Sequence, residues 1–315
     1  MNFTTKIPIT KSTHPIDYSA QMVSLGSCFA DNIGCKFQYF KFQIATNPFG
    51  IIFNPIAIEN LVNRVVHHRK FTNDDVFFHN DLWHSFEVHS ALSHPDKDFF
   101  LINLNQILEE LYILLTKSTH ILITYGTSWI YRNSETKKAV ANCHKVPQNQ
   151  FDKEILSVEI IEKSIQNTIE LVRSINPHCN FIFTVSPVRH IKDGFVENQR
   201  SKAHLITAMH NVQHTIQYSN YFPSYEIMMD ELRDYRFYAE DMLHPNQTAI
   251  DYIWERFVEV HINETSYSIM EDVASIQRGL AHRPLNPNTT THQQFLNKLN
   301  EKINKIKAQF PDMEI

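Results

Sequence analysis

Two short apolar runs, residues 121–125 and 181–185, lie on either side of a segment with helical periodicity at residues 158–175. Strands that are apolar on both faces are typical of a parallel sheet that helices cover on each side. A strand, a helix and a second strand in this order form the unit from which such sheets are built. The pattern therefore predicts an α/β fold with a mainly parallel sheet, and further strands are expected at residues 44–46 and 225–229.

An earlier apolar stretch, residues 23–25, ends at Gly26 and is followed by Ser27 and Cys28 before a helical segment begins at Ala30. A strand that stops at a glycine and turns into a helix presents its turn side chains at the carboxyl edge of the sheet. Open α/β folds place their chemistry at that edge. The first N–H groups of the new helix lack partners there and can receive a developing negative charge. We therefore expect the reactive centre at this turn.

A second block, Asp241 and His244, lies just before an amphipathic helix for which Asn246 is a suitable N-cap. Residues three apart share one face of a helical turn, so the carboxylate can hold the imidazole in one tautomer. The other ring nitrogen is then available to take a proton from a nucleophile. With Ser27 or Cys28, this pair predicts a nucleophile–histidine–aspartate triad.

Both blocks also carry a family resemblance. Residues 26–30, Gly-Ser-Cys-Phe-Ala, resemble the signature of the GSCFA-domain family, a relative of the SGNH (GDSL) esterase and lipase superfamily. Asp241 and His244, followed by Pro245, are similar to the superfamily's closing Asp-x-x-His-Pro block. The resemblance covers roughly residues 23–257. It implies a flavodoxin-like three-layer α/β/α sandwich and an esterase or acyltransferase activity.

The superfamily pattern leaves the identity of the nucleophile open. On its Gly-Asp-Ser-Leu block, Cys28 falls on the nucleophilic serine and Ser27 falls on the aspartate before it. A cysteine at a helix N-terminus near a histidine has a lowered pKa, and its thiolate is a strong nucleophile. Serine with histidine is the more usual esterase pair, so Ser27 is the alternative if the register moves by one residue. A site that binds without reacting is the third interpretation.

The resemblance further implies an oxyanion hole assembled from several segments. The N–H groups of Cys28 and Gly50 would donate to the oxyanion, and Gly126 is expected to belong to the same hole. Ser128, in the sequence Gly126-x-Ser128, takes the place of the superfamily's asparagine, and its hydroxyl can donate one hydrogen bond. The alternatives are an ordinary loop at Gly50 and a cap of the following segment at Thr127 and Ser128.

A histidine- and aromatic-rich segment, about residues 67–103, is predicted to be an inserted subdomain that walls the site. Its histidine spacing fits neither one helix face nor one strand face, and catalytic zinc usually requires three convergent ligands. We therefore expect no metal and no cofactor. The residues expected to face the substrate are Asn47, Trp83, His84, His144 and Arg189, of which Arg189 would anchor a carboxylate or phosphate.

Composition excludes some functions. The net charge of −5 gives no reason to expect nucleic acid, whose binding needs a basic face. The N-terminus lacks the apolar core of a signal peptide, and we expect no membrane span. The four cysteines show no disulfide or metal spacing, which favours a cytoplasmic location. The chain becomes polar after residue 261. Residues 1–261 are thus predicted to form the main domain and residues 262–315 a C-terminal helical appendage packed on it, with the oligomeric state open.

The sequence thus predicts an acyl-ester hydrolase or acyltransferase that acts on a small-molecule, glycan or lipid ester through a covalent acyl-enzyme. The competing prediction is a non-catalytic carbohydrate- or acyl-ligand-binding protein, because Ser27 and Ser128 replace an aspartate and an asparagine of the superfamily. A metallohydrolase built on the histidine-rich insert is a third alternative to be weighed against these two. A nucleophile within hydrogen-bond distance of His244 would favour chemistry, whereas one turned into the core would favour binding.

Overall fold

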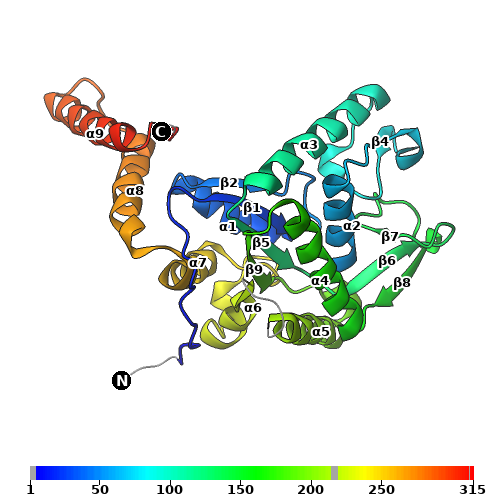
Figure 1. Cartoon of the computed structure of the whole chain (residues 1–315). Coiled ribbons are helices and arrows are strands. Elements are labelled where there is room, and N and C mark those ends of the chain that lie inside the picture. The colour runs from blue at the N-terminus through cyan, green and yellow to red at the C-terminus, as the bar shows by residue number, and fades with distance from the viewer. Residues whose placement is uncertain (1–4, 214–218, 312) are drawn as a thin grey trace.

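A parallel sheet forms the centre of the molecule, which a computed structural model describes for residues 5–213, 219–311 and 313–315 (Figure 1). Each neighbouring pair of strands in this sheet is parallel. Its five strands, in the order β10-β9-β5-β1-β2, are β1 (Gln21–Gly26), β2 (Gln43–Thr46), β5 (His120–Tyr125), β9 (Asn180–Val185) and β10 (Ser219–Phe222).

Helices cover both faces of this sheet, because alternate strand residues point to opposite faces and both sets are apolar. Val23, Ile121 and Phe181 face one helical layer, and Met22, Leu122 and Ile182 face the other. The first layer contains α2 (Pro55–Val66), α3 (Lys97–Lys117), α4 (Val158–Ile175) and α5 (Phe195–Gln213), and the second contains α1 (Cys28–Tyr39) and α7 (Gln247–His261). The predicted α/β sandwich is confirmed.

The strand order reverses direction between β1 and β5. From β1 the chain adds β2 on one side and then β5, β9 and β10 on the other, which is the flavodoxin-like order. In open α/β sheets, ligands bind outside the carboxyl ends of the strands at such a reversal. Gly26 ends β1 and Gly126 follows β5, so both glycines lie at this position.

Two small antiparallel sheets flank the main one. The first is the hairpin of β3 (Phe77–His79) and β4 (Leu82–His84), inside the predicted insert. The second has the order β7-β6-β8 and consists of β6 (Trp129–Asn133), β7 (Ala139–Val140) and β8 (Phe151–Ile155). The sequence analysis did not predict this second sheet.

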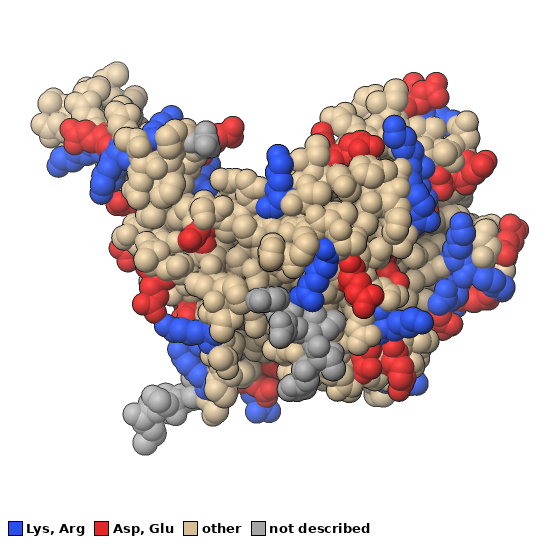
Figure 2. All heavy atoms as spheres, viewed as in Figure 1, with Lys and Arg blue, Asp and Glu red and all other residues tan. Residues whose placement is uncertain are grey.

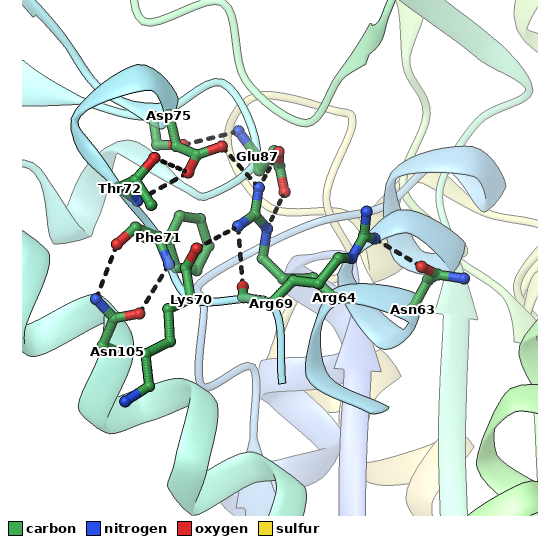
Figure 3. Close-up of polar contacts among 10 residues, drawn as sticks. Asn63, Arg64, Arg69, Lys70, Phe71, Thr72, Asp75, Glu87 and Asn105 are labelled. Carbon is green, nitrogen blue, oxygen red and sulfur yellow. Dashed lines mark hydrogen bonds and ion pairs between the residues drawn. The ribbon is translucent and has the colours of Figure 1, made fainter. Parts of the chain in front are cut away.

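A buried arginine on α2 ties the insert to the main domain (Figure 3). Arg64 donates to both carboxylate oxygens of Glu87 at 2.7 Å and to Asp75 at 2.8 Å. Its Cζ lies 4.2 Å from the centre of the Phe71 ring. The planar fork of an arginine suits such bidentate pairing. Because both carboxylates belong to the insert, this segment is held firmly against the domain that carries the sheet.

The prediction of a strand at residues 225–229 is wrong. Residues Ser224–Glu226 form the short helix α6, and Ile227–Glu231 continue as a π-helical turn, while the last strand is β10. Ile227 and Met228 are fully buried in the layer that contains α7. A short apolar run fits a buried helical turn as well as a strand, so the pattern alone could not separate them.

The C-terminal segment is helical, with α8 (Tyr267–Ala281) and α9 (Thr290–Gln309). The two helices pack on each other through Ile276, Leu299 and Ile306. They stand out from the main domain as a separate lobe (Figure 1, Figure 2). Contact with the main domain includes Phe310, whose ring centre lies 5.3 Å from that of Tyr18.

Among the described helices, α3 is long and apolar enough to cross a membrane by length and composition. Five of its residues, Phe100, Leu104, Leu108, Leu111 and Leu115, are buried in the protein interior. The core helix of a folded domain passes the same test, so this finding alone does not assign a membrane role.

Candidate active site

The turn after β1 requires a glycine. Gly26 has φ +141°, and a Cβ added there would lie 2.2 Å from the backbone oxygen of Thr124 on β5. The next N–H, that of Ser27, donates to the same oxygen at 3.0 Å. Only a residue without a side chain allows β1 to end this close to β5. The turn therefore delivers Ser27 and Cys28 directly onto the carboxyl edge of the sheet.

Ser27 and Cys28 have different environments at this turn. Ser27 is buried and caps α1, because its Oγ accepts the N–H of Phe29 at 3.2 Å. Cys28 is the first residue of α1 and is only partly buried. Cys28 is thus the more accessible of the two side chains. Its own backbone N–H has no acceptor among the described residues.

The protonation state of Cys28 is set by opposing influences. Burial raises the pKa of the Cys28 thiol, and the nearby Asp31 carboxylate raises it further. The N–H groups at the start of α1 and the charge of Lys202 lower that pKa, but they do not outweigh burial. The resting side chain is therefore a thiol at neutral pH, and its attack on a carbonyl requires a base.

The predicted pair of Asp241 and His244 is formed. His244 Nδ1 lies 2.6 Å from Asp241 Oδ2, and Oδ1 accepts the N–H groups of Leu243 at 2.8 Å and of His244 at 3.0 Å. These two N–H bonds and the imidazole lower the pKa of Asp241 to about 2. The ionised carboxylate accepts from Nδ1–H, which leaves Nε2 as the basic nitrogen.

The loop that carries His244 reaches the same sheet edge as Cys28. The N–H of Arg189, just after β9, donates to the backbone oxygen of Leu243 at 3.2 Å. Within the described residues, no hydrogen bond joins His244 to Cys28 or to Ser27. Cys28 and His244 thus share an edge of the sheet without direct contact.

The predicted oxyanion hole needs correction. The N–H of Gly50 donates to Asn47 O at 2.7 Å, and that of Gly126 donates to Phe53 O at 2.8 Å. The Ser128 hydroxyl, fully buried, faces α5 and donates to a backbone oxygen there at 3.2 Å. All three groups are engaged inside the protein, and the N–H of Cys28 is the remaining donor of the predicted set.

Asn47, predicted to contact substrate, instead braces the turn. Its Oδ1 accepts the N–H of Gly26 at 2.8 Å, and its Nδ2 donates to Asp31 at 2.7 Å. The side chain is buried. Asn47 therefore positions the start of α1 and one charge near Cys28.

Trp83, His84 and His144, also predicted to contact substrate, pack within the insert and its surroundings. His84 is buried between Ser93 Oγ at 2.6 Å and the backbone oxygen of His79 at 2.9 Å. His144 Nε2 lies 2.7 Å from the backbone oxygen of Ser85, and burial lowers the pKa of His144 to about 4. The Trp83 ring lies 4.7 Å from the ammonium of a lysine on α3. These contacts account for the three side chains without a substrate.

Arg189 lies nearer to the site than the other predicted contact residues. Its guanidinium donates to the hydroxyls of Tyr235 at 3.3 Å and Tyr238 at 2.6 Å and lies over both rings. Its backbone N–H donates to Leu243 in the loop that carries His244. Arg189 is therefore a brace of that loop.

Two residues that the sequence analysis missed lie at the same edge. Lys202 on α5 is 1% exposed, and its Nζ donates to the backbone oxygens of Gly126 at 2.6 Å and Ser186 at 2.7 Å. His190 Nε2 is buried and has no hydrogen-bond partner among the described residues, and a Cβ added at Gly126 would lie 3.1 Å from it. Burial, with the charges of Lys202 and His244, lowers the pKa of His190 to about 3. His190 directly follows Arg189, whereas no sequence signal marked Lys202.

A cavity of about 270 Å³ opens beside His190. Phe53, Trp129 and Tyr131 contribute aromatic walls, and Thr127 and His89 add polar groups. Its volume is just below the usual range for ligand pockets, which suits a small ligand or one end of a larger ligand. In the described parts of the chain, no group of three or more His, Cys, Asp or Glu side chains could hold a metal ion.

Fold and site together define an α/β protein with a flavodoxin-like parallel sheet and a cysteine-bearing turn at the reversal of strand order. The model of the GSCFA family matches residues 21–257, and the model of the GSCFA domain protein, C-terminal domain, matches residues 273–315. The chain belongs to the GSCFA family. No curated protein matches the sequence.

Proposed function

We propose that this GSCFA-family protein is an acyl-ester hydrolase or acyltransferase related to the SGNH superfamily, with Cys28 as nucleophile and His244 as general base. The observation that carries the proposal is the Asp241–His244 bond of 2.6 Å on a loop that reaches the edge where Cys28 begins α1. A carboxylate that holds a histidine beside a nucleophile at a sheet's carboxyl edge is the arrangement that acyl transfer requires.

In the proposed reaction, the Cys28 sulfur attacks the carbonyl carbon of the ester while His244 Nε2 takes the thiol proton. The carbonyl oxygen becomes an oxyanion, to which the N–H of Cys28 donates. Collapse of this intermediate breaks the ester bond, and the leaving alcohol takes the proton from His244. Water or a second alcohol then attacks the thioester with His244 as base, which releases the acyl group and restores the thiol.

The approach of His244 to Cys28 is part of the proposal. Catalytic hydrogen bonds are often long or absent without substrate and form in the complex. The His244 side chain is 47% exposed, so its ring has room to turn toward an ester seated above Cys28. Ser27 is the less suitable nucleophile, because its hydroxyl is buried and accepts from the helix.

The substrate class in this proposal is a small-molecule, glycan or lipid acyl ester, and the reaction needs no cofactor. We also propose that the protein works in the cytoplasm. All four cysteines are free thiols, and a reducing compartment would keep the Cys28 thiol available.

A non-catalytic acyl- or carbohydrate-binding protein is the second candidate. Two observations favour it: burial raises the pKa of Cys28, and no hydrogen bond links Cys28 with His244 in the described structure. The aromatic cavity beside His190 would then hold the ligand without a covalent step.

Intact-protein mass after incubation with p-nitrophenyl and thioester acyl donors tests both candidates. Variants Cys28→Ala, Ser27→Ala and His244→Ala are compared with the wild type, and Cys35→Ala serves as control because Cys35 is an exposed thiol that can be acylated without catalysis. We expect an acyl adduct that disappears in Cys28→Ala and His244→Ala and persists in Ser27→Ala and Cys35→Ala. Loss only in Ser27→Ala would transfer the role to Ser27. Absence of any adduct or turnover would overturn the enzyme proposal in favour of the binding protein.

A further inference from the structure

We propose that the exposed face of α3 is a dimer interface, against which a second copy of this chain packs its own α3 in the antiparallel direction. The two copies would be related by a two-fold axis, which is the commonest symmetry of soluble oligomers. No residue of this face belongs to the candidate active site, so the inference stands or falls independently of the proposed activity.

Helix α3 is apolar on two opposite sides. One side is buried in the main core through Phe100, Leu104, Leu108, Leu111 and Leu115. The other side exposes four large apolar side chains by 36% to 67% of their surface, namely Phe99, Ile102, Ile113 and Leu114. Only 28% of the most apolar 18-residue window of α3 is buried. Exposed apolar side chains gathered on one helix face mark a place where another molecule packs.

The exposed side forms a single row along the helix, which we call the α3 stripe. Its members are spaced by three or four residues and therefore lie on one helix face: Phe99, Ile102, Gln106, Glu110, Ile113 and Lys117. Helices pack against each other through rows of side chains with this spacing. The stripe is apolar near both ends and polar in the middle, where Gln106 donates to Glu110 at 2.8 Å. A partner helix must therefore present apolar groups near both ends and polar groups in the middle.

A second α3 in the antiparallel direction meets this requirement. The helix runs from Lys97 to Lys117, so its midpoint is residue 107. With the two-fold axis at that point, Ile102 of each copy lies within one residue, or about 1.5 Å along the helix, of Ile113 in the other copy. The polar middle of one stripe, at Gln106, then meets the polar middle of the other.

The charges at the ends of α3 favour the antiparallel direction. Asp98 lies in the first turn, close to the N-cap Asp96, and Lys117 lies in the last turn. The same two-fold axis places Lys117 of each copy level with residue 97 of the other, between these two carboxylates. The intervening Lys97 is turned toward Trp83, and its ammonium lies 4.7 Å from the centre of that ring. A parallel pair would instead bring like charges together at both ends.

Asp98 and Lys117 are both available for such a contact. Both are exposed, and in the parts of the chain that the structure describes neither side chain has an ion-pair or hydrogen-bond partner. Each charge suits the dipole of its own helix, which favours acidic groups at the start and basic groups at the end. The antiparallel pair adds an opposite charge from the second copy at each end.

The size of the α3 stripe sets the expected strength of the dimer. A helix of 21 residues is about 30 Å long and presents a face about 10 Å wide. This area is less than the roughly 800 Å² that each partner buries in a standard specific interface. We therefore expect a reversible dimer that forms at micromolar protein concentration.

Sedimentation velocity of the full chain over a range of concentrations tests the interface. We expect the wild type to dimerise, and Ile102→Glu and Ile113→Glu each to weaken the dimer by more than about tenfold, because each substitution places two charges in an apolar contact. Ile160→Glu on α4 is the matched control, because Ile160 is 46% exposed and lies outside the α3 stripe. This control should dimerise as the wild type does, and circular dichroism checks that every variant is folded.

A charge exchange tests the direction of the pair and leaves the apolar contact unchanged. Asp98→Lys and Lys117→Asp should each weaken self-association by several-fold, because each places a charge opposite one of its own sign. An equimolar mixture of the two variants should recover the dimer, since the antiparallel pair of one variant with the other restores opposite charges at both ends.

Three results would overturn the inference. The first is a wild type that stays monomeric up to about 100 µM. The second is a dimer that Ile102→Glu, Ile113→Glu and both charge variants leave unchanged, because its interface would then lie elsewhere. The third is a monomeric wild type that binds vesicles of phosphatidylcholine and phosphatidylglycerol and loses this binding in Ile102→Glu, which would assign the exposed face of α3 to a membrane surface.

Discussion

Replacement of Gly26 by alanine tests how the turn after β1 is built. Gly26 has φ +141°, and the new Cβ would lie 2.2 Å from the Thr124 backbone oxygen and 2.9 Å from two further Thr124 backbone atoms. Backbone atoms of a central strand cannot rotate away as a side chain can. Relief therefore requires β1 to move from β5, which strains the 3.0 Å bond from the Ser27 N–H to the Thr124 oxygen.

The expected loss of stability has two parts. An alanine held at this positive φ costs about 1–3 kcal/mol, because the region is favourable only for glycine. Crowding a packed region by one methyl group costs about 1–3 kcal/mol more. Together, Gly26→Ala should lower the free energy of unfolding by about 2–6 kcal/mol, which is a large share of the roughly 5–15 kcal/mol that stabilises a typical domain.

Gly194→Ala separates the two parts. Gly194 also has a positive φ, +99°, but a Cβ there would meet nothing within 4 Å. Its replacement should therefore cost the conformational strain alone. Urea unfolding of both variants and the wild type, followed by circular dichroism, measures the difference. Equal losses for Gly26→Ala and Gly194→Ala would refute the argument that close approach to β5 dictates the glycine.

Two further predictions concern the insert and acid stability. Arg64→Met should cost about 3 kcal/mol in urea unfolding and speed proteolysis within residues 67–90, since it leaves both carboxylates of the insert unpaired. The exposed-pair control Arg132→Met should cost less than about 1 kcal/mol, and equal losses would contradict this account. Burial holds the pKa of His144 at about 4 and those of His190 and His261 at about 3, so between about pH 6.5 and 4 the unfolded chain binds protons that the folded protein does not. Stability should therefore fall as pH falls below about 6.5, by up to about 1.4 kcal/mol per pH unit for each histidine. Urea midpoints at several pH values would show this, and His261→Leu should reduce the slope; a flat profile would refute it.

The sequence was sufficient for β1, β2, β5 and β9, because their signals are local, but it did not predict β10. The apolar runs at residues 121–125 and 181–185 and the helical stripe at 158–175 correspond to β5, β9 and α4. The strand prediction for residues 225–229 was wrong, because an apolar run buried in the helical layer has the same composition as a buried strand. The β6–β8 sheet was missed because its strands are partly exposed and carry few alternating apolar residues.

The site was predictable only where its geometry is local in sequence. The Asp241–His244 bond joins residues three apart, and the turn at Gly26 is a contiguous segment, so spacing alone could indicate both. Lys202 lies within an amphipathic helix, where a lysine is typically solvent-exposed. Its burial depends on how α5 docks against the ends of β5 and β9, which no local pattern encodes.

In the proposed reaction, the balance of charges at this edge makes the reactivity of Cys28 depend on the His244 loop. Burial and Asp31 keep Cys28 protonated, and Lys202 opposes them only in part. In the proposed reaction, a thiol in that state attacks only when a base takes its proton, so the rate of acylation is expected to depend on the approach of His244. The loop that carries His244 is bonded through Leu243 to the backbone of Arg189 at the end of β9. Because Lys202 also bonds near the end of β9, at Ser186, the buried lysine and the proposed base are positioned by the same short segment.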